Sequence, residues 1–147
     1  MSEILDKATE AVKQGISSFC RFITANDVGS TGSHQSGFYI PKHAWPLLFD
    51  APGVRGENKS LPIQIKWNDD LVTDSRAIYY GVRSRNEYRI TRFGKGFPFL
   101  EEAHSGSLLV MTKMSQSAFS GFVLDHDTDI EGFLDYFDLA PPTASTD

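Results

Sequence analysis

Residues 83–95 read Arg-Ser-Arg-Asn-Glu-Tyr-Arg-Ile-Thr-Arg-Phe-Gly-Lys, and this stretch holds five cations and one anion. The whole chain of 147 residues has a formal net charge of −5, so the remainder carries nine Lys and Arg against eighteen Asp and Glu, or −9. An acidic protein that gathers its positive charge in one short segment is typical of proteins that bind a phosphate backbone. The alternative interpretation is a solvated hairpin with ion pairs between its strands.

The side chains in this stretch also suit the edges of DNA bases. Arginine outnumbers lysine four to one, and a guanidinium fork matches the guanine edge, which makes Arg85 and Arg89 candidates for guanine. Asn86 suits adenine, and Glu87 could accept a hydrogen bond from the cytosine amino group. A plain ion pair between Glu87 and Arg85 or Arg89 remains possible, although an exposed pair contributes only about 0–1 kcal/mol.

Alternation along a strand over 87–92 predicts which of these side chains reach the DNA. In a β-barrel that binds DNA, Ile90 should pack inward, so Tyr88 and Arg92 should flank the barrel. Glu87 and Arg89 should then point toward the groove of the DNA.

A second unusual stretch, residues 26–37, is long, polar and contains three glycines. A loop of this kind inside a compact domain is usually functional or disordered. Asn26, Asp27, His34 and Gln35 could reach base edges or phosphates from it, and Asp27 could instead form a local turn.

The rest of the chain predicts a mostly antiparallel β-domain with helices at its margins. Apolar spacing indicates a helix over 3–19, a short helix from Pro41 to about Phe49, and a C-terminal helix that starts at a capping box over 128–131. Strands are expected at 19–23, 38–40, 61–67, 76–81, 87–92, 107–113 and 119–124, with a turn at 68–70.

Composition limits the remaining possibilities. The single Cys20 excludes an internal disulfide framework and a Cys-based zinc site, and it fits a reducing compartment. No apolar run approaches 18 residues and no signal pattern opens the chain, so we expect an intracellular protein without a membrane segment. Residues 1–138 should form one domain, monomeric by itself, and 139–147 have the composition of a linker toward a catalytic domain that lies outside this chain.

Enzyme signals in the sequence are weak. Residues 125–129 resemble the start of a calcium loop, but Ile130 stands where Gly is needed. Glu57 and Lys59 have the Glu-x-Lys spacing of Mg²⁺-dependent nucleases, yet they lie in a Gly/Pro-rich loop, and the four histidines show no ligand spacing. We therefore expect no catalytic residue, metal site or cofactor here. A small Mg²⁺-dependent nuclease and a protein-interaction module with a basic hairpin are the alternatives.

Three strings carry a family resemblance. Residues 25–41 read Ala-Asn-Asp-Val-Gly-Ser-Thr-Gly-Ser-His-Gln-Ser-Gly-Phe-Tyr-Ile-Pro, residues 76–80 read Arg-Ala-Ile-Tyr-Tyr, and residues 85–96 read Arg-Asn-Glu-Tyr-Arg-Ile-Thr-Arg-Phe-Gly-Lys-Gly. They closely resemble the N-terminal effector-DNA-binding domain of EcoRII-type restriction endonucleases.

The resemblance implies a mainly β fold with flanking helices, an open pseudobarrel of about seven strands shared with plant B3-type domains. It also implies that two arms, 26–37 and 83–95, grip the major groove of double-stranded DNA and read 5′-CCWGG. The family's cleavage, with its Mg²⁺, would belong to a separate nuclease domain of the parent protein in a prokaryotic cytoplasm.

Carried over position by position, the resemblance implies a set of DNA-contacting residues. Positive charge adds two more candidates, Arg92 and Lys95, and Lys95 would contact DNA regardless of base sequence. Two members, Arg83 and Tyr88, stand where the close relative has lysines, and at Tyr88 the positive charge is lost. The carried-over set is His34, Tyr39, Arg83, Arg85, Asn86, Glu87, Tyr88 and Arg89.

Overall fold

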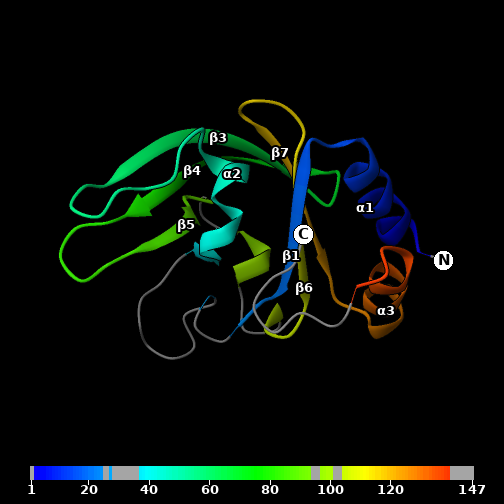
Figure 1. Ribbon diagram of the computed structural model, residues 1–147. Helices are drawn as coiled ribbons and strands as arrows, with labels where there is room; N and C mark the ends of the chain where they lie inside the picture. Colours follow the sequence, from blue (N-terminus) through cyan, green and yellow to red (C-terminus); the bar gives the residue numbers. More distant parts are fainter. Residues whose placement is uncertain (1, 25–26, 28–36, 94–96, 101–103, 140–147) are drawn as a thin grey trace.

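A computed structural model describes residues 2–24, 27, 37–93, 97–100 and 104–139, and these residues include seven strands. Figure 1 shows the sheet and the helices beside it. The mainly β character expected from the sequence is confirmed. The elements in chain order are α1 (Glu3–Gln14), β1 (Ser17–Phe22), β2 (Gly37–Ile40), η1 (Lys42–Ala44), α2 (Trp45–Leu48), β3 (Lys59–Trp67), β4 (Leu71–Tyr80), β5 (Glu87–Thr91), η2 (Pro98–Leu100), β6 (Leu108–Lys113), β7 (Ala118–Leu124) and α3 (Asp127–Tyr136).

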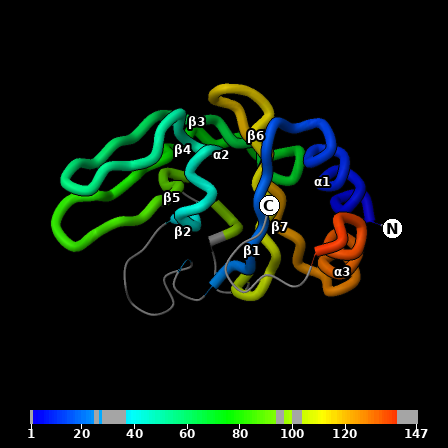
Figure 2. The backbone as a smooth tube through the Cα atoms, in the orientation of Figure 1, coloured from blue at the N-terminus to red at the C-terminus, as the bar shows by residue number. Residues whose placement is uncertain are grey.

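The strands form one curled sheet in the order β1-β6-β7-β3-β4-β5-β2. Every neighbouring pair is antiparallel except β3 and β7, which run parallel. The edge strands β1 and β2 share no ladder, so the barrel is open along the seam between them, and the tube view shows the curl (Figure 2).

The inner face of the curled sheet holds an aromatic core. Along β3, alternate residues Ile63, Ile65 and Trp67 are buried, as the period of two predicts. Trp67 packs edge-to-face against Phe93 and Phe97, and its indole N–H donates to Thr73 Oγ1 at 3.0 Å. This core fixes the strands that carry the polar outer face.

A second core lies between the sheet and the helices α1 and α3, which sit together at the right of Figure 1. Ser2 caps α1 by accepting from the Leu5 N–H at 3.1 Å, and its hydroxyl donates to Asp129 of α3 at 2.8 Å. No helix among the described residues combines the length and the apolar character that are needed to cross a bilayer.

Both terminal helices differ in their limits from those expected. Helix α1 ends at Gln14 because Gly15 packs tightly against β6, where an added Cβ would lie 2.2 Å from Thr112 Cγ2. The following residues pair with β6 from Ser17 onward, so strand pairing overrides the helical spacing up to residue 19. Helix α3 has His126 as its N-cap with no side-chain capping bond, so the capping box expected at Thr128 is wrong.

Candidate nucleic-acid interface

The connection between β4 and β5, residues 81–86, projects from one end of the sheet, at the left of Figure 1. We call it the 81–86 loop. Arg83 is exposed and adopts a left-handed backbone with φ +63°. Arg85 is also exposed, and its guanidinium lies over the Tyr80 ring at 3.8 Å from the centroid. The loop thus presents two arginines to solvent, one of them held by an aromatic face.

Strand register brings Tyr39, which follows the first predicted arm, onto one outer face with residues of the second arm. Tyr39 of β2 pairs with Arg89 of β5, which in turn pairs with Ile78 of β4. Two residues earlier in β5, Glu87 pairs with Tyr80, whose ring lies under the Arg85 guanidinium. Directly opposed residues in an antiparallel pair point to the same side. The polar face of β2, β4 and β5 therefore continues into the 81–86 loop.

Glu87 lies between two arginines and forms ion pairs with both. Its Oε1 accepts from Arg85 in a short contact, and its Oε2 lies 3.8 Å from Arg89 Nε. The ion pair considered as an alternative for Glu87 is therefore present in the protein without DNA. A base contact by Glu87 would exchange this pairing for one with DNA.

Arg89 was expected to point toward the DNA groove, but its side chain is buried in the structure. Its side chain is only 4% exposed, Nη1 donates to the Gly37 carbonyl at 3.2 Å, and the buried Nε has no hydrogen-bond partner among the described residues. On β5, the middle strand between β2 and β4, its guanidinium lies between the Gly37 carbonyl of β2 and the Glu87 carboxylate of its own strand. Reading guanine would require this guanidinium to turn outward, and that role stays a prediction.

Tyr88 is a core residue, which corrects its expected place at the flank of the barrel. It is 3% exposed, its ring centroid lies 4.8 Å from that of Tyr79, and its hydroxyl accepts from the Gly53 N–H at 2.7 Å. The strand alternation was right to place Tyr88 on the side of Ile90, but that side is the barrel interior. Tyr88 is thus not presented to a phosphate in this structure, whereas Asn86 stays half-buried with Oδ1 accepting from the Tyr79 hydroxyl at 2.7 Å.

Asp27 is likewise structural. Both its carboxylate oxygens lie 2.6 Å from Arg21 Nη2, and the side chain is about 1% exposed. Of its two interpretations, the local turn is the one observed, because Oδ2 also accepts from the Thr24 N–H at 2.9 Å. Sequence reasoning missed Arg21, although an arginine between Phe22 and Cys20 in a predicted buried strand was a usable signal.

Residues 51–58 form the loop that leads into β3. In the structure this 51–58 loop projects beside the 81–86 loop (Figure 1). Gly56 N–H donates to the Gly81 carbonyl at 2.7 Å, and the Gly81 N–H donates to Asn58 Oδ1 at 2.9 Å. Arg55 Nη2 donates to the Arg83 carbonyl at 3.1 Å. The two loops therefore form one projecting unit.

The remaining predicted DNA-contacting residues lie away from this projecting unit or outside the described residues. Arg92 is exposed at the far end of β5 from Glu87, with φ +67°, and lines a hollow of about 410 Å³ with Arg76 and Asp74. Outside the described residues lie Asn26, His34, Gln35 and Lys95.

The nuclease alternative finds little support in the geometry of Glu57 and Lys59. Lys59 Nζ donates to the Ala51 carbonyl at 3.2 Å and lies over the Phe49 ring, and no salt bridge in the described part of the chain joins it to Glu57. Among the residues that the structure describes, no group of three His, Cys, Asp or Glu side chains could hold a metal ion.

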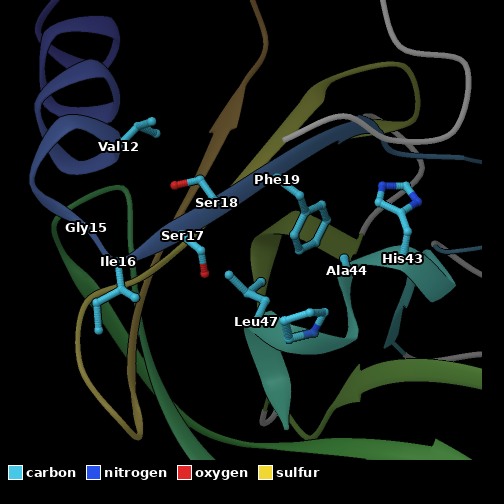
Figure 3. A pocket seen from close by; sticks show the side chains of 10 residues that line it. Val12, Gly15, Ile16, Ser17, Ser18, Phe19, His43, Ala44 and Leu47 are labelled. Carbon is cyan, nitrogen blue, oxygen red and sulfur yellow. The ribbon is translucent and has the colours of Figure 1, made fainter. Parts of the chain in front are cut away.

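A separate hollow of about 320 Å³ lies between the start of β1 and the η1–α2 segment (Figure 3). Val12, Phe19 and Leu47 give it a largely apolar lining, with His43 at one side. It contains none of the predicted DNA-contacting residues and does not suit an anionic ligand.

Comparison with known proteins agrees with this architecture. The chain resembles the crystal structure of the UbaLAI restriction endonuclease B3 domain with cognate DNA, with a TM-score of 0.56 over 99% of this chain and 98% of the other at 17% identity. The fold is therefore a B3-like pseudobarrel, as expected. Residues 12–141 match the family described as "Restriction endonuclease EcoRII, N-terminal", and the chain belongs to this family.

A curated relative extends the comparison. The chain is 35% identical over 108 residues to the Type II restriction enzyme EcoRII of Escherichia coli. The match covers 69% of this chain and 25% of the relative, so the chain spans about a quarter of that enzyme's length.

Proposed function

We propose that this chain is the sequence-specific double-stranded DNA-recognition domain of a Type II restriction endonuclease. The observation that carries the proposal is the outer face on which register unites Tyr39, Arg89 and Glu87 with Arg85 of the projecting 81–86 loop. Membership of the EcoRII N-terminal family and the B3-like fold support it. The proposed target is 5′-CCWGG, read by two arms in the major groove.

The face has the chemistry for direct readout. Arg85 can fork onto guanine O6 and N7, and Glu87 can accept from cytosine N4, both in the major groove. Such contacts would replace the ion pairs that Glu87 makes without DNA. Arg83, exposed and in no salt bridge within the described part of the chain, suits a phosphate. Tyr39, half-buried on the same face, adds a hydroxyl group.

Cleavage belongs, in this proposal, to a separate nuclease domain of the parent protein, which would use Mg²⁺. The support is that the E. coli relative is a Type II restriction enzyme about four times as long as the matched region. The recognition domain itself would act as a monomer without a cofactor, in the cytoplasm of a prokaryotic cell.

A panel of duplexes, each changed at one position of CCWGG, tests the proposal by gel shift. We expect each mismatch to cost about 1–3 kcal/mol of binding free energy. Addition of Mg²⁺ should leave the bound DNA uncut. Equal affinity for all duplexes would contradict sequence-specific recognition and favour a protein-interaction module, and cleavage would favour the small nuclease.

A further inference from the structure

The 51–58 loop lies against the 81–86 loop so closely that the two cannot move independently without losing contacts. An added Cβ at Gly53 would lie 2.5 Å from the Tyr79 ring, and one at Gly81 would lie 2.4 Å from the Glu57 carbonyl oxygen. The Gly56 N–H donates to the Gly81 carbonyl, and the Gly81 N–H donates to the Asn58 side-chain oxygen. Any ligand that approaches the 81–86 loop therefore also meets the 51–58 loop.

The contact concentrates positive charge at the projecting end. Arg55 and Arg83 are both exposed, and the Arg55 guanidinium donates to the Arg83 carbonyl at 3.1 Å. No ion pair among the described residues involves either of them. Glu57, exposed in the same loop, is the nearby carboxylate in sequence, and it too forms no such pair. One hydrogen bond to a carbonyl leaves most of the five guanidinium donors available.

We propose that Arg55 is a DNA-phosphate contact, supplied by an element outside the two arms expected from the sequence. The proposal rests on the proposed DNA-binding function. An arm inserted in the major groove, about 12 Å wide, has a phosphate backbone along each side. Arg55 flanks the 81–86 loop and would meet one of these backbones. A phosphate contact positions the protein without reading sequence.

Salt dependence separates this role from base recognition. The chain with Arg55→Gln keeps a side-chain donor near the Arg83 carbonyl but loses the charge, and Arg55→Lys keeps the charge. Affinity is measured for a CCWGG duplex and for a scrambled duplex between about 50 and 200 mM salt. We expect Arg55→Gln to lower the salt slope by about 0.9 on both duplexes, whereas Arg55→Lys retains the wild-type slope.

Lys13→Gln is the matched control, because Lys13 belongs to α1, which lies at the opposite side of the molecule from the 81–86 loop (Figure 1), and the change should leave the slope unchanged. Thermal unfolding checks that each variant is folded, and substitution at an exposed position should preserve the fold. A wild-type slope for Arg55→Gln, or a loss on one duplex alone, would overturn the proposal. If the wild-type chain fails to prefer CCWGG, the proposed function fails, while the slope on scrambled DNA still decides the role of Arg55.

Discussion

Arg21 of β1 and Asp27 form a buried ion pair at the open seam of the barrel, with both carboxylate oxygens 2.6 Å from Arg21 Nη2. The same guanidinium donates through Nε to the Tyr39 carbonyl of β2 at 2.7 Å and through Nη1 to the Phe22 carbonyl at 2.6 Å. Asp27 Oδ1 in turn accepts from the Tyr39 N–H at 3.3 Å. One side-chain pair thus joins two edge strands that share no ladder.

The first prediction concerns the loss of this pair. Asp27→Asn leaves the Arg21 charge buried without its counter-ion, so we expect the free energy of unfolding to fall by about 3–5 kcal/mol. Urea unfolding measures it, with Asp70→Asn at an exposed turn position as the control, which should stay within about 0.5 kcal/mol of wild type. A cost below about 1 kcal/mol would mean that water or another group replaces the carboxylate.

The second prediction concerns Glu87, which forms ion pairs with Arg85 and Arg89 in the absence of DNA. Glu87→Gln should weaken binding to the cognate duplex by about 1–3 kcal/mol, because a neutral amide oxygen accepts from cytosine N4 more weakly than a carboxylate does. It should strengthen binding to scrambled DNA, because two arginines lose their competing carboxylate. Glu10→Gln on α1 is the control. Parallel losses on both duplexes would show that Glu87 acts only by supporting the fold.

The third prediction tests Tyr88 as a core residue. Tyr88→Phe removes the acceptor for the Gly53 N–H and should cost about 0.5–1.5 kcal/mol of unfolding free energy. The salt slope of DNA binding should be unchanged, because the hydroxyl does not meet phosphate. Chemical denaturation and fluorescence titration supply the two readouts. A shallower slope with unchanged stability would restore Tyr88 to the DNA-contacting set.

The fourth prediction concerns pH. Hydrogen bonds from Lys7 lower the pKa of Glu3, 2.8 Å away within α1, and the pKa of Asp69, 3.2 Å away in the β3–β4 turn. The second contact ties α1 to that turn. A carboxyl group whose pKa is lowered in the folded state stabilises the fold at pH values above its unfolded-state pKa. This contribution is lost as the pH falls through the folded-state pKa, below about pH 4. Lys7→Met should therefore lower Tm at neutral pH, and the difference from wild type should vanish in acid. A difference that persists in acid would point to lost packing of the lysine stem.

The sequence predicted most strands because alternation records which face is buried, as Ile63, Ile65 and Trp67 show. It also predicted the family through strings that include the register partners Tyr39 and Arg89. It could not predict that Arg89 and Asp27 are buried, because that depends on strands and side chains distant in sequence. Arg55 was missed for a similar reason, since only the folded chain places it beside Arg83.

Strands β2 and β5 pair in a fixed register. An insertion or deletion of one residue inside either strand would therefore turn its recognition side chains toward the aromatic core. Changes of length confined to the connecting segments leave that ladder untouched. The connecting segments could therefore be exchanged as cassettes between relatives while the lengths of Gly37–Ile40 and Glu87–Thr91 stay fixed, and base preference would be changed by substitutions at Arg85 and Glu87.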